Sequence, residues 1–366
     1  MLRIVEYTIS DLERCLWPGR WFQCDPVPIT KQRALSHVRN PRAEKTDVAL
    51  LVAYDEDVVV GHLGVLPDKA FVNLGEQKIG WVTAWWADPD RKYVGLGLML
   101  LMRALNLYGG RLGASGFSDD ARKVYDATKR FAMIKDAQGV SGIARLNLCR
   151  LLRRRLPSLA KLRTVLGAVD AIVNVCVSIR QFWWRKSHRL PGSCQIEYFA
   201  ELDQEADEFI QRHSAAGLTR RGARELNWII NYPWVLCAPL ARRSSFHFSA
   251  QAESYSVYCI KIYTPGGLAA VLLLTMMDGH VTVPYCYHGG QSKLIARVLC
   301  HFLIVQRAER LTIYEPELIE ELSALRFPWL GMIHKRRTWI WSRECAGQGS
   351  NKFSMQDGDG DCAFAT

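Results

Sequence analysis

The feature that most constrains the fold is an order of apolar segments that occurs twice along the chain. Residues 48–74 predict a pair of strands, and residues 78–88 predict a third. A helix, a short strand and a second helix follow, and from about residue 255 the same order returns. Strands that alternate with helices bury a sheet between helical layers. The chain is therefore predicted to be an α/β protein with two similar domains, each a mixed sheet flanked by helices.

The length and composition agree with two globular domains. The chain has 366 residues, and a prior of about 150 residues per domain gives two domains. Hydrophobic residues make up 49% and charged residues 23%, which excludes disorder, collagen and coiled coil as the main architecture. The N-terminus has no apolar stretch typical of a secretory signal, and the eleven cysteines include no C-x-x-C pair. We therefore expect a cytoplasmic protein with reduced thiols.

Basic residues are concentrated in one segment between the two predicted domains. Residues 141–190 contain eleven basic residues and one acidic residue, a net charge of +10, whereas the whole chain carries +11. The predicted division is an N-terminal domain, a basic helical linker, a second domain and a flexible tail, at residues 1–140, 141–195, 196–343 and 344–366. The tail contains an Asp-Gly-Asp-Gly-Asp run but lacks the acid that completes a calcium loop, so no metal site is predicted.

A helix is predicted over residues 159–187 of the linker. Its polar residues recur at helical spacing and form one narrow stripe: Arg163, Asp170, Asn174, Ser178, Gln181 and Arg185. The remainder is apolar, and Trp183 and Trp184 stand near its end, as in helices that lie in a membrane interface. Two interpretations stay open: peripheral contact with an anionic membrane at its inner face, or packing between the two domains. The apolar core of about 15 residues is too short to span a bilayer, and nucleic acid is not favoured.

The most informative stretch lies where the third strand ends and an apolar helix begins. Pro89 turns the chain, and Lys92, Gly95 and Gly97 form a basic-x-x-G-x-G spacing before the helix. Backbone N–H groups in the first turn of a helix point outward, and the helix dipole adds partial positive charge. Glycines let a ligand approach the main chain closely. The pattern therefore predicts a site for a pyrophosphate group.

A second motif follows the next predicted strand. Ser118, Ala121 and Tyr125 form S-x-x-A-x-x-x-Y at the start of a helix. Together the two motifs resemble those of the GNAT superfamily of acyl-CoA-dependent N-acyltransferases, with Lys92 in place of the family's Arg or Gln and Ser118 in place of its Asn. The resemblance covers residues 48–131, and the two-halved chain is similar to the tandem GNAT-like proteins of bacterial surface-polysaccharide synthesis. It implies two GNAT-like domains joined by the basic helical linker.

The resemblance also implies a reaction, the transfer of an acetyl or other acyl group from CoA to an amine without a metal. The residues that it implies in binding acetyl-CoA lie at the end of the third strand, in the glycine loop and at the start of the next helix: Trp86, Ala87, Lys92, Val94, Gly95, Leu96, Gly97 and Ser118. Tyr125 is implied as the general acid, because a phenol can protonate a leaving thiolate. Asp88, Asp119 and His62 are possible general bases, and the sequence does not choose among them.

The second half lacks these motifs. His288, Gly289 and Gly290 stand at its matching junction without the basic-x-x-G-x-G spacing, so this half is predicted to be degenerate and without CoA. The narrower resemblance implies an amino-sugar acceptor of a surface glycan. Two alternatives stay open: an aminoacyl-tRNA-dependent transferase of the cell-wall type, which the basic segment would suit, and a non-catalytic membrane-associated scaffold that kept the fold.

Overall fold

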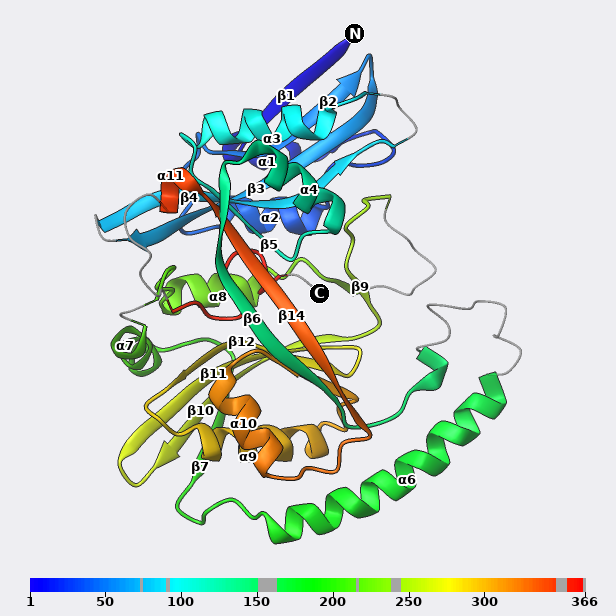
Figure 1. Ribbon diagram of the computed structural model, residues 1–366, viewed down its shortest axis with the longest axis vertical. Coiled ribbons are helices and arrows are strands. Elements are labelled where there is room, and N and C mark those ends of the chain that lie inside the picture. Colours follow the sequence, from blue (N-terminus) through cyan, green and yellow to red (C-terminus); the bar gives the residue numbers. More distant parts are fainter. Residues whose placement is uncertain are drawn as a thin grey trace. The chain divides into compact units, whose positions relative to one another are not determined.

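The structure is a computed structural model that describes residues 1–72, 75–89, 93–150, 163–214, 217–237, 245–346 and 354–364 (Figure 1). The chain forms two compact units, each assembled from separate stretches of sequence. Unit 1 contains Met1–Asp136, Glu201–Tyr255 and Arg337–Thr366, and unit 2 contains Ala137–Ala200 and Ser256–Arg336. The predicted boundaries assume domains that follow one another along the chain, whereas the chain passes between the units four times.

Unit 1 is built on strands in the order β1-β2-β3-β4-β5-β14. Their bounds are Leu2–Thr8 (β1), Val48–Asp55 (β2), Val58–Val72 (β3), Gly75–Ala87 (β4), Leu112–Ser115 (β5) and Gly331–Ser342 (β14, in unit 1 from Arg337 on). Neighbouring strands are antiparallel except β4 and β5, which run parallel. The strand pair predicted over residues 48–74, the strand over 78–88 and the short strand before Ser118 are confirmed.

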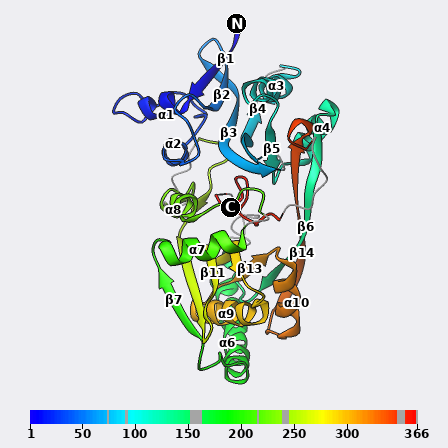
Figure 2. The same cartoon turned by 90° about the vertical axis from the view of Figure 1, so that its left-hand side faces the viewer.

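Helices cover both faces of the unit 1 strands (Figure 2). α1 (Ile9–Cys15) and α2 (Lys31–Val38) lie on one side, and α3 (Leu96–Leu107) lies on the other. The side chains of β2 alternate between the two layers: Leu50 and Val52 pack with α1 and α2, while Leu51 and Ala53 pack with α3. Successive side chains of a strand point to opposite faces, so a strand covered on both faces is apolar throughout.

The remaining elements of unit 1 come from three parts of the chain. They are α4 (Asp119–Thr128), α7 (Gln204–His213), α8 (Ala223–Asn231), β8 (Leu236–Cys237), β9 (Gln251–Ala252) and α11 (Arg343–Ala346). α7 and α8 belong to unit 1, whereas the predicted boundaries place residues 204–231 in the second domain.

Unit 2 has the strand order β6-β13-β12-β11-β10-β7. Its strands are β6 (Phe131–Ile143), β7 (Gln195–Phe199), β10 (Tyr255–Thr264), β11 (Gly267–Met277), β12 (His280–His288) and β13 (Arg310–Ile313), and its helices are α6 (Arg163–Ser187), α9 (Ser292–Val305) and α10 (Pro316–Ala324). One core joins β10 to β13 with α9 and α10. By length and composition α6 is long and apolar enough to cross a membrane, whereas the sequence predicts an apolar core too short to span.

The last strand of each half of the chain pairs with a strand of the other half. β6 follows α4, yet its residues 140–143 pair with β13 in unit 2. β14 follows α10, yet its residues 339–341 pair with β5 in unit 1. Neither strand is predicted from the sequence, because charged residues in the middle of each one interrupt the apolar pattern that marks a buried strand. Each unit therefore completes its sheet with a strand from far away in the sequence.

The C-terminal segment differs from the prediction of a flexible tail. Residues 354–364 pack in unit 1, where Phe364 is buried and stacks on Trp234 with ring centroids 4.5 Å apart. Asp357 pairs with Arg337 of β14 at 2.5 Å. A Gly- and Asp-rich composition is typical of solvated tails, but here the carboxylates find buried partners that the local sequence does not contain.

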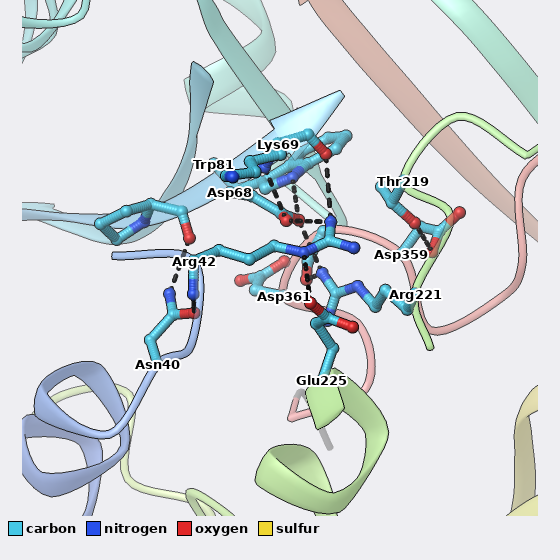
Figure 3. Close-up of polar contacts among 12 residues, drawn as sticks. Asn40, Arg42, Asp68, Lys69, Trp81, Thr219, Arg221, Glu225, Asp359 and Asp361 are labelled. Carbon is cyan, nitrogen blue, oxygen red and sulfur yellow. Dashed lines mark hydrogen bonds and ion pairs between the residues drawn. The ribbon is translucent and has the colours of Figure 1, made fainter. Parts of the chain in front are cut away.

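A buried ion-pair network stabilises unit 1 beside this segment (Figure 3). Asp68 of β3 accepts hydrogen bonds from Arg42 at 2.8 Å and from Arg221 at 2.7 Å. Burial alone would raise the pKa of Asp68, but the guanidinium groups of Arg221 and Arg42 hold it below its usual value. Arg221 also donates to the carbonyl oxygen of Gly360 at 3.3 Å, which places the neighbouring Asp361.

Candidate active site

A pocket opens where β4 and β5 separate. The two strands pair in parallel over three residues, ending with Val82 opposite Ala114. Beyond this pair β4 continues to Ala87, while β5 ends and the chain turns into α4. The pocket has a volume of about 440 Å³ and is lined by residues 82–85, 114–118, 121, 125 and 248–250 together with Arg33 and Asp361. A volume of this size is ordinary for a small-molecule site.

A β-bulge forms one wall of the pocket. Gly64 of β3 pairs with Thr83 and His62 pairs with Trp86, so β4 has one residue more than the strand that it faces. Ala84, in this bulge, has a φ of 48°. His62 Nδ1 lies 2.8 Å from the carbonyl oxygen of Ala84, which can only accept, so this ring nitrogen donates. Burial lowers the pKa of His62 to about 3, so the neutral ring holds the bulge and is a very weak base.

α3 begins at the predicted glycine loop. Gly95 is its N-cap residue with a φ of 85°, which glycine adopts without strain, and no side chain of the described residues caps the helix. Val94 is exposed, Leu96 is buried, and Ala87 packs in the cluster with α3. Lys92 lies outside the described residues, so its predicted role rests on the sequence. The N–H groups in the first turn of a helix have no partner within the helix, so this end suits an anion.

Trp85 connects the loop to the pocket. A Cβ on Gly97 would lie 3.3 Å from the Trp85 indole, and the same indole packs on Tyr125 with ring centroids 5.4 Å apart. Trp86, which the resemblance implies in CoA binding, belongs to the other layer, where it stacks on His247 at 4.2 Å. Alternation along β4 explains the difference, so that Trp85 lines the pocket and Trp86 packs with α1 and α2.

Ser118 and Tyr125 line the pocket from α4. Ser118 is the N-cap residue, and its Oγ accepts a hydrogen bond from the N–H of Ala121 at 3.2 Å. Tyr125 is 2% exposed and packs against the rings of Phe117 and Phe131. Burial raises the pKa of Tyr125 far above its usual value. The phenol therefore holds its proton at neutral pH, and the same burial makes it a weaker acid than an ordinary tyrosine.

The acid that lines the pocket is not one that the sequence singles out. Asp361 accepts a hydrogen bond from Ser115 Oγ at 2.7 Å. Burial raises the pKa of Asp361, and the bond from Ser115 and the charge of Arg33 offset part of the rise. A carboxylate with a raised pKa is a stronger base than an ordinary aspartate.

Among the described residues that line the pocket, none of the three predicted bases occurs. Asp119 is exposed in the first turn of α4, Asp88 lies after the end of β4, and His62 holds the bulge. The signal for Asp361 was present as the run of aspartates and glycines near the C-terminus, but a local pattern cannot reveal that this run is buried.

A buried arginine stands in the same pocket. Arg33 of α2 donates to Thr83 Oγ1 and to the carbonyl oxygen of Phe248, each at 3.2 Å. Its guanidinium lies 4.2 Å from the ring centroid of Trp234. Burial lowers the pKa of Arg33 to about 10, and the charge of Asp361 opposes that shift. Among its described lining residues the pocket thus holds a cation, the buried Arg33, and an acid, the partly buried Asp361.

Comparison with known proteins adds likenesses of fold. No protein-family model matches the sequence, and no curated protein matches it. Among solved structures, a GCN5-related N-acetyltransferase from Anabaena variabilis is 10% identical with a TM-score of 0.49, over 93% of this chain and 72% of that one. A tandem GNAT protein from the clavulanic acid biosynthesis pathway is 14% identical with a TM-score of 0.47, over 93% and 98%. N-myristoyltransferase from Saccharomyces cerevisiae is 9% identical with a TM-score of 0.49, over 93% and 82%.

Proposed function

We propose that this protein is an acyl-CoA-dependent N-acyltransferase whose reaction takes place in the pocket of unit 1. The observation that carries the proposal is the opening between β4 and β5 beside the uncapped, glycine-led start of α3. A thioester can enter between the two strand ends while the pyrophosphate of the same molecule meets the N-terminus of the helix. The residues fit such a substrate, because the space beside the Gly95 main chain is open: a Cβ at Gly95 would meet nothing within 4 Å.

The bulge in β4 supplies the electrophilic part of the site. An extra residue in a strand leaves backbone groups outside the ladder, and residues 84 and 85 line the pocket. A backbone N–H at this point donates to the thioester oxygen as negative charge develops on it. His62 acts as a positioning residue, because its bond to the Ala84 carbonyl orients the bulge.

Two side chains complete the proton transfers. Asp361 accepts a proton from the attacking amine, whose nitrogen forms a bond to the acyl carbon. Tyr125 donates its proton to the sulfur as the carbon–sulfur bond breaks, so that the thiol leaves neutral. Asp361 then releases its proton to solvent and Tyr125 takes up a proton from solvent, which restores both groups. Catalysis needs no metal in this scheme.

The positive charge of Arg33 restricts the class of amine that can accept the acyl group. Its hydrogen bonds to Thr83 and Phe248 use two of the five N–H donors of a guanidinium. A buried cation beside a substrate pocket favours an acceptor that carries a carboxylate or phosphate as well as its amine. A nucleotide- or lipid-linked amino sugar meets this condition, in keeping with the amino-sugar prediction, and so does an amino acid.

The test is release of free CoA thiol, followed with a thiol reagent, from acetyl-CoA and longer acyl-CoA esters in the presence of a panel of amines. The panel pairs each anionic amine with its uncharged analogue, for example an amino-sugar phosphate with the free amino sugar. We expect turnover that depends on the amine, with the anionic member of a pair preferred at least tenfold. Calorimetric titration with CoA measures binding separately from turnover.

The alternatives give different results in the same assays. A transferase that uses aminoacyl-tRNA would be stabilised in a thermal shift by aminoacyl-tRNA and not by acetyl-CoA. A non-catalytic scaffold would release no thiol with any amine. Failure to bind any acyl-CoA would overturn the proposal.

A further inference from the structure

Three polar residues of α6 hydrogen-bond to residues 144–149 of unit 2, the unit to which α6 belongs. The Asp170 carboxylate accepts hydrogen bonds from two backbone N–H groups of residues 144–149, at 2.9 and 3.3 Å. Asn174 both accepts from and donates to the backbone of the same segment, at 2.9 and 2.8 Å. Gln181 donates to a carbonyl oxygen there at 3.2 Å. These three residues belong to the polar stripe predicted from the sequence, and all three hydrogen-bond to the backbone of the helix's own unit.

The opposite face of α6 is apolar and exposed. Six large apolar residues are each between 51% and 67% exposed: Val165, Ile172, Val175, Ile179, Phe182 and Trp183. At 100° per residue they lie on the side of the helix away from Asp170. A helix on the surface of a water-soluble domain packs its apolar stripe against the core and exposes its polar residues. α6 buries Val177 and Trp184 against its unit as such a helix does, but its outer face is apolar as well. The exposed apolar face therefore indicates an apolar environment on the outer side of α6.

Charges at the end of α6 identify that environment. Arg180, Arg185 and Lys186 are exposed beside the apolar face. The Lys186 ammonium lies 4.6 Å from the ring centroid of Phe182 and 5.4 Å from that of Trp183. Aromatic rings and cations gathered at one level of an apolar helix are typical of the boundary between lipid headgroups and acyl chains. The +10 charge of residues 141–190 favours lipids with anionic headgroups.

The hydrogen bonds of α6 decide how it would meet a bilayer. The stretch Thr164–Ser187 passes the length and hydropathy criteria for a membrane span, as buried core helices of soluble proteins also do, but only 11% of its most apolar window is buried. To cross a bilayer, however, Asp170 and Asn174 would have to leave their partners in residues 144–149 and enter hydrocarbon. Lying parallel to the surface keeps these bonds and immerses only the apolar face.

We propose that α6 is a membrane-docking element, which seats unit 2 on the surface of a bilayer that contains anionic phospholipid. The proposal is independent of the acyl-transfer chemistry, because every contact that supports it lies within unit 2.

Flotation of the purified full-length protein with phosphatidylcholine vesicles, with and without phosphatidylserine, tests the proposal. We expect binding to the anionic vesicles at low salt, weaker binding at high salt and little binding to the neutral vesicles. The substitution of Arg180, Arg185 and Lys186 by Gln should weaken binding on the order of a hundredfold, because each basic residue near an anionic surface contributes about fivefold.

A second variant tests the apolar face. The triple substitution Ile172→Glu, Val175→Glu and Ile179→Glu should abolish flotation, because it puts three negative charges against the lipid. Val305→Glu is the matched control, since Val305 is an exposed apolar residue at the end of α9 in the same unit. Circular dichroism and melting temperature verify that each variant is folded.

Three results would overturn the proposal. The first is failure of the parent protein to bind anionic vesicles at low salt. The second is equal flotation of the parent and a folded triple-Glu variant. The third is a dimer, detected by sedimentation velocity without lipid, that the triple substitution dissolves, because it would assign the face to a second copy of the chain.

Discussion

The two halves of the chain carry the same irregularity at the same place, with different chemistry. In unit 1, β4 bulges at residues 84 and 85, against one facing residue of β3. In unit 2, β12 bulges at residues 283 and 284, against one facing residue of β11. The second bulge contains Pro284, which has no N–H to donate. The bulge in unit 1 therefore has backbone N–H groups that can donate, whereas Pro284 removes one such donor from the bulge in unit 2.

The second helix after each bulge, α4 in unit 1 and α10 in unit 2, differs in the same way: at the matching position only α4 carries a residue that can donate a proton. Tyr125 stands seven residues after the N-cap residue of α4, and the equivalent position after the N-cap residue of α10 is Leu322. Asp361 reaches the unit 1 pocket from the C-terminal segment. The comparison teaches that the shared order of strands and helices supplies the frame, while a few polar groups added to one unit supply the proposed chemistry.

The largest expected effect concerns the acid in the unit 1 pocket. Asp361→Asn keeps the shape of the side chain and its bond from Ser115 but cannot accept a proton, so kcat should fall by about 10³-fold. Free-thiol release measures kcat, and calorimetry should show unchanged affinity for CoA. Asp357→Asn, in the same segment but away from the pocket, is the control and should keep its activity. An equal loss in both variants would make the segment a structural support and remove Asp361 as the base.

The next prediction tests whether the C-terminal segment is docked in solution. Burial raises the pKa of Asp357 to about 6 against a reference of 3.8, and Arg337 offsets part of the rise. The folded state therefore holds this proton after the unfolded chain has released it, and stability falls as the pH rises from about 4 to about 6. The parent should lose up to about 3 kcal/mol relative to Asp357→Asn over this range. Urea unfolding at several pH values measures the free energy of unfolding of the parent and of Asp357→Asn. If the two free energies change with pH in the same way, Asp357 lies in solvent.

The third prediction sharpens the contrast between Tyr125 and Leu322. Tyr125→Phe should lower kcat by about 10²-fold with little change in CoA affinity, because it removes one positioned proton donor. Tyr108→Phe is the matched control: Tyr108 is buried in the same core and donates to the Val48 carbonyl at 2.9 Å. It should lose about 1 kcal/mol of stability and no activity. A Tyr125→Phe rate within about threefold of the parent would leave Tyr125 as a packing residue.

The smallest effect compares two glycines at matching junctions. Gly95 and Gly290 have φ values of 85° and 82°, and a Cβ at either would meet nothing within 4 Å. Gly95→Ala and Gly290→Ala should therefore destabilise the protein by a similar amount, about 1 kcal/mol, measured by thermal unfolding. Only Gly95→Ala should weaken CoA binding, by about tenfold, because its methyl group enters the space beside the N–H groups in the first turn of α3. Equal CoA affinities in the two variants would contradict the assignment of the loop.

Local sequence patterns predicted most individual elements. The apolar run that becomes β2, the glycine at the start of α3 and the Ser118 cap of α4 each depend on residues within a few positions of one another. Alternation and helical spacing report such neighbours directly, so the repeated order of strands and helices is confirmed in both halves. Gly95 and Gly97 of the first motif, and the residues of the second motif, lie on the predicted elements for the same reason.

The assembly of the site was decided by contacts far apart in the chain. β14 pairs with β5, more than 200 residues away, and Asp361 reaches Ser115 over a separation of 246 residues. Burial of an acid or an edge strand depends on partners that the local sequence does not contain, so charged residues in β14 and aspartates near the C-terminus resemble solvent-exposed segments. By itself the sequence determined which segments are strands and helices, because that choice is set by near neighbours. Only the tertiary structure decided which of them share a sheet and which acid enters the pocket, because those choices depend on the free energy of burying distant groups together.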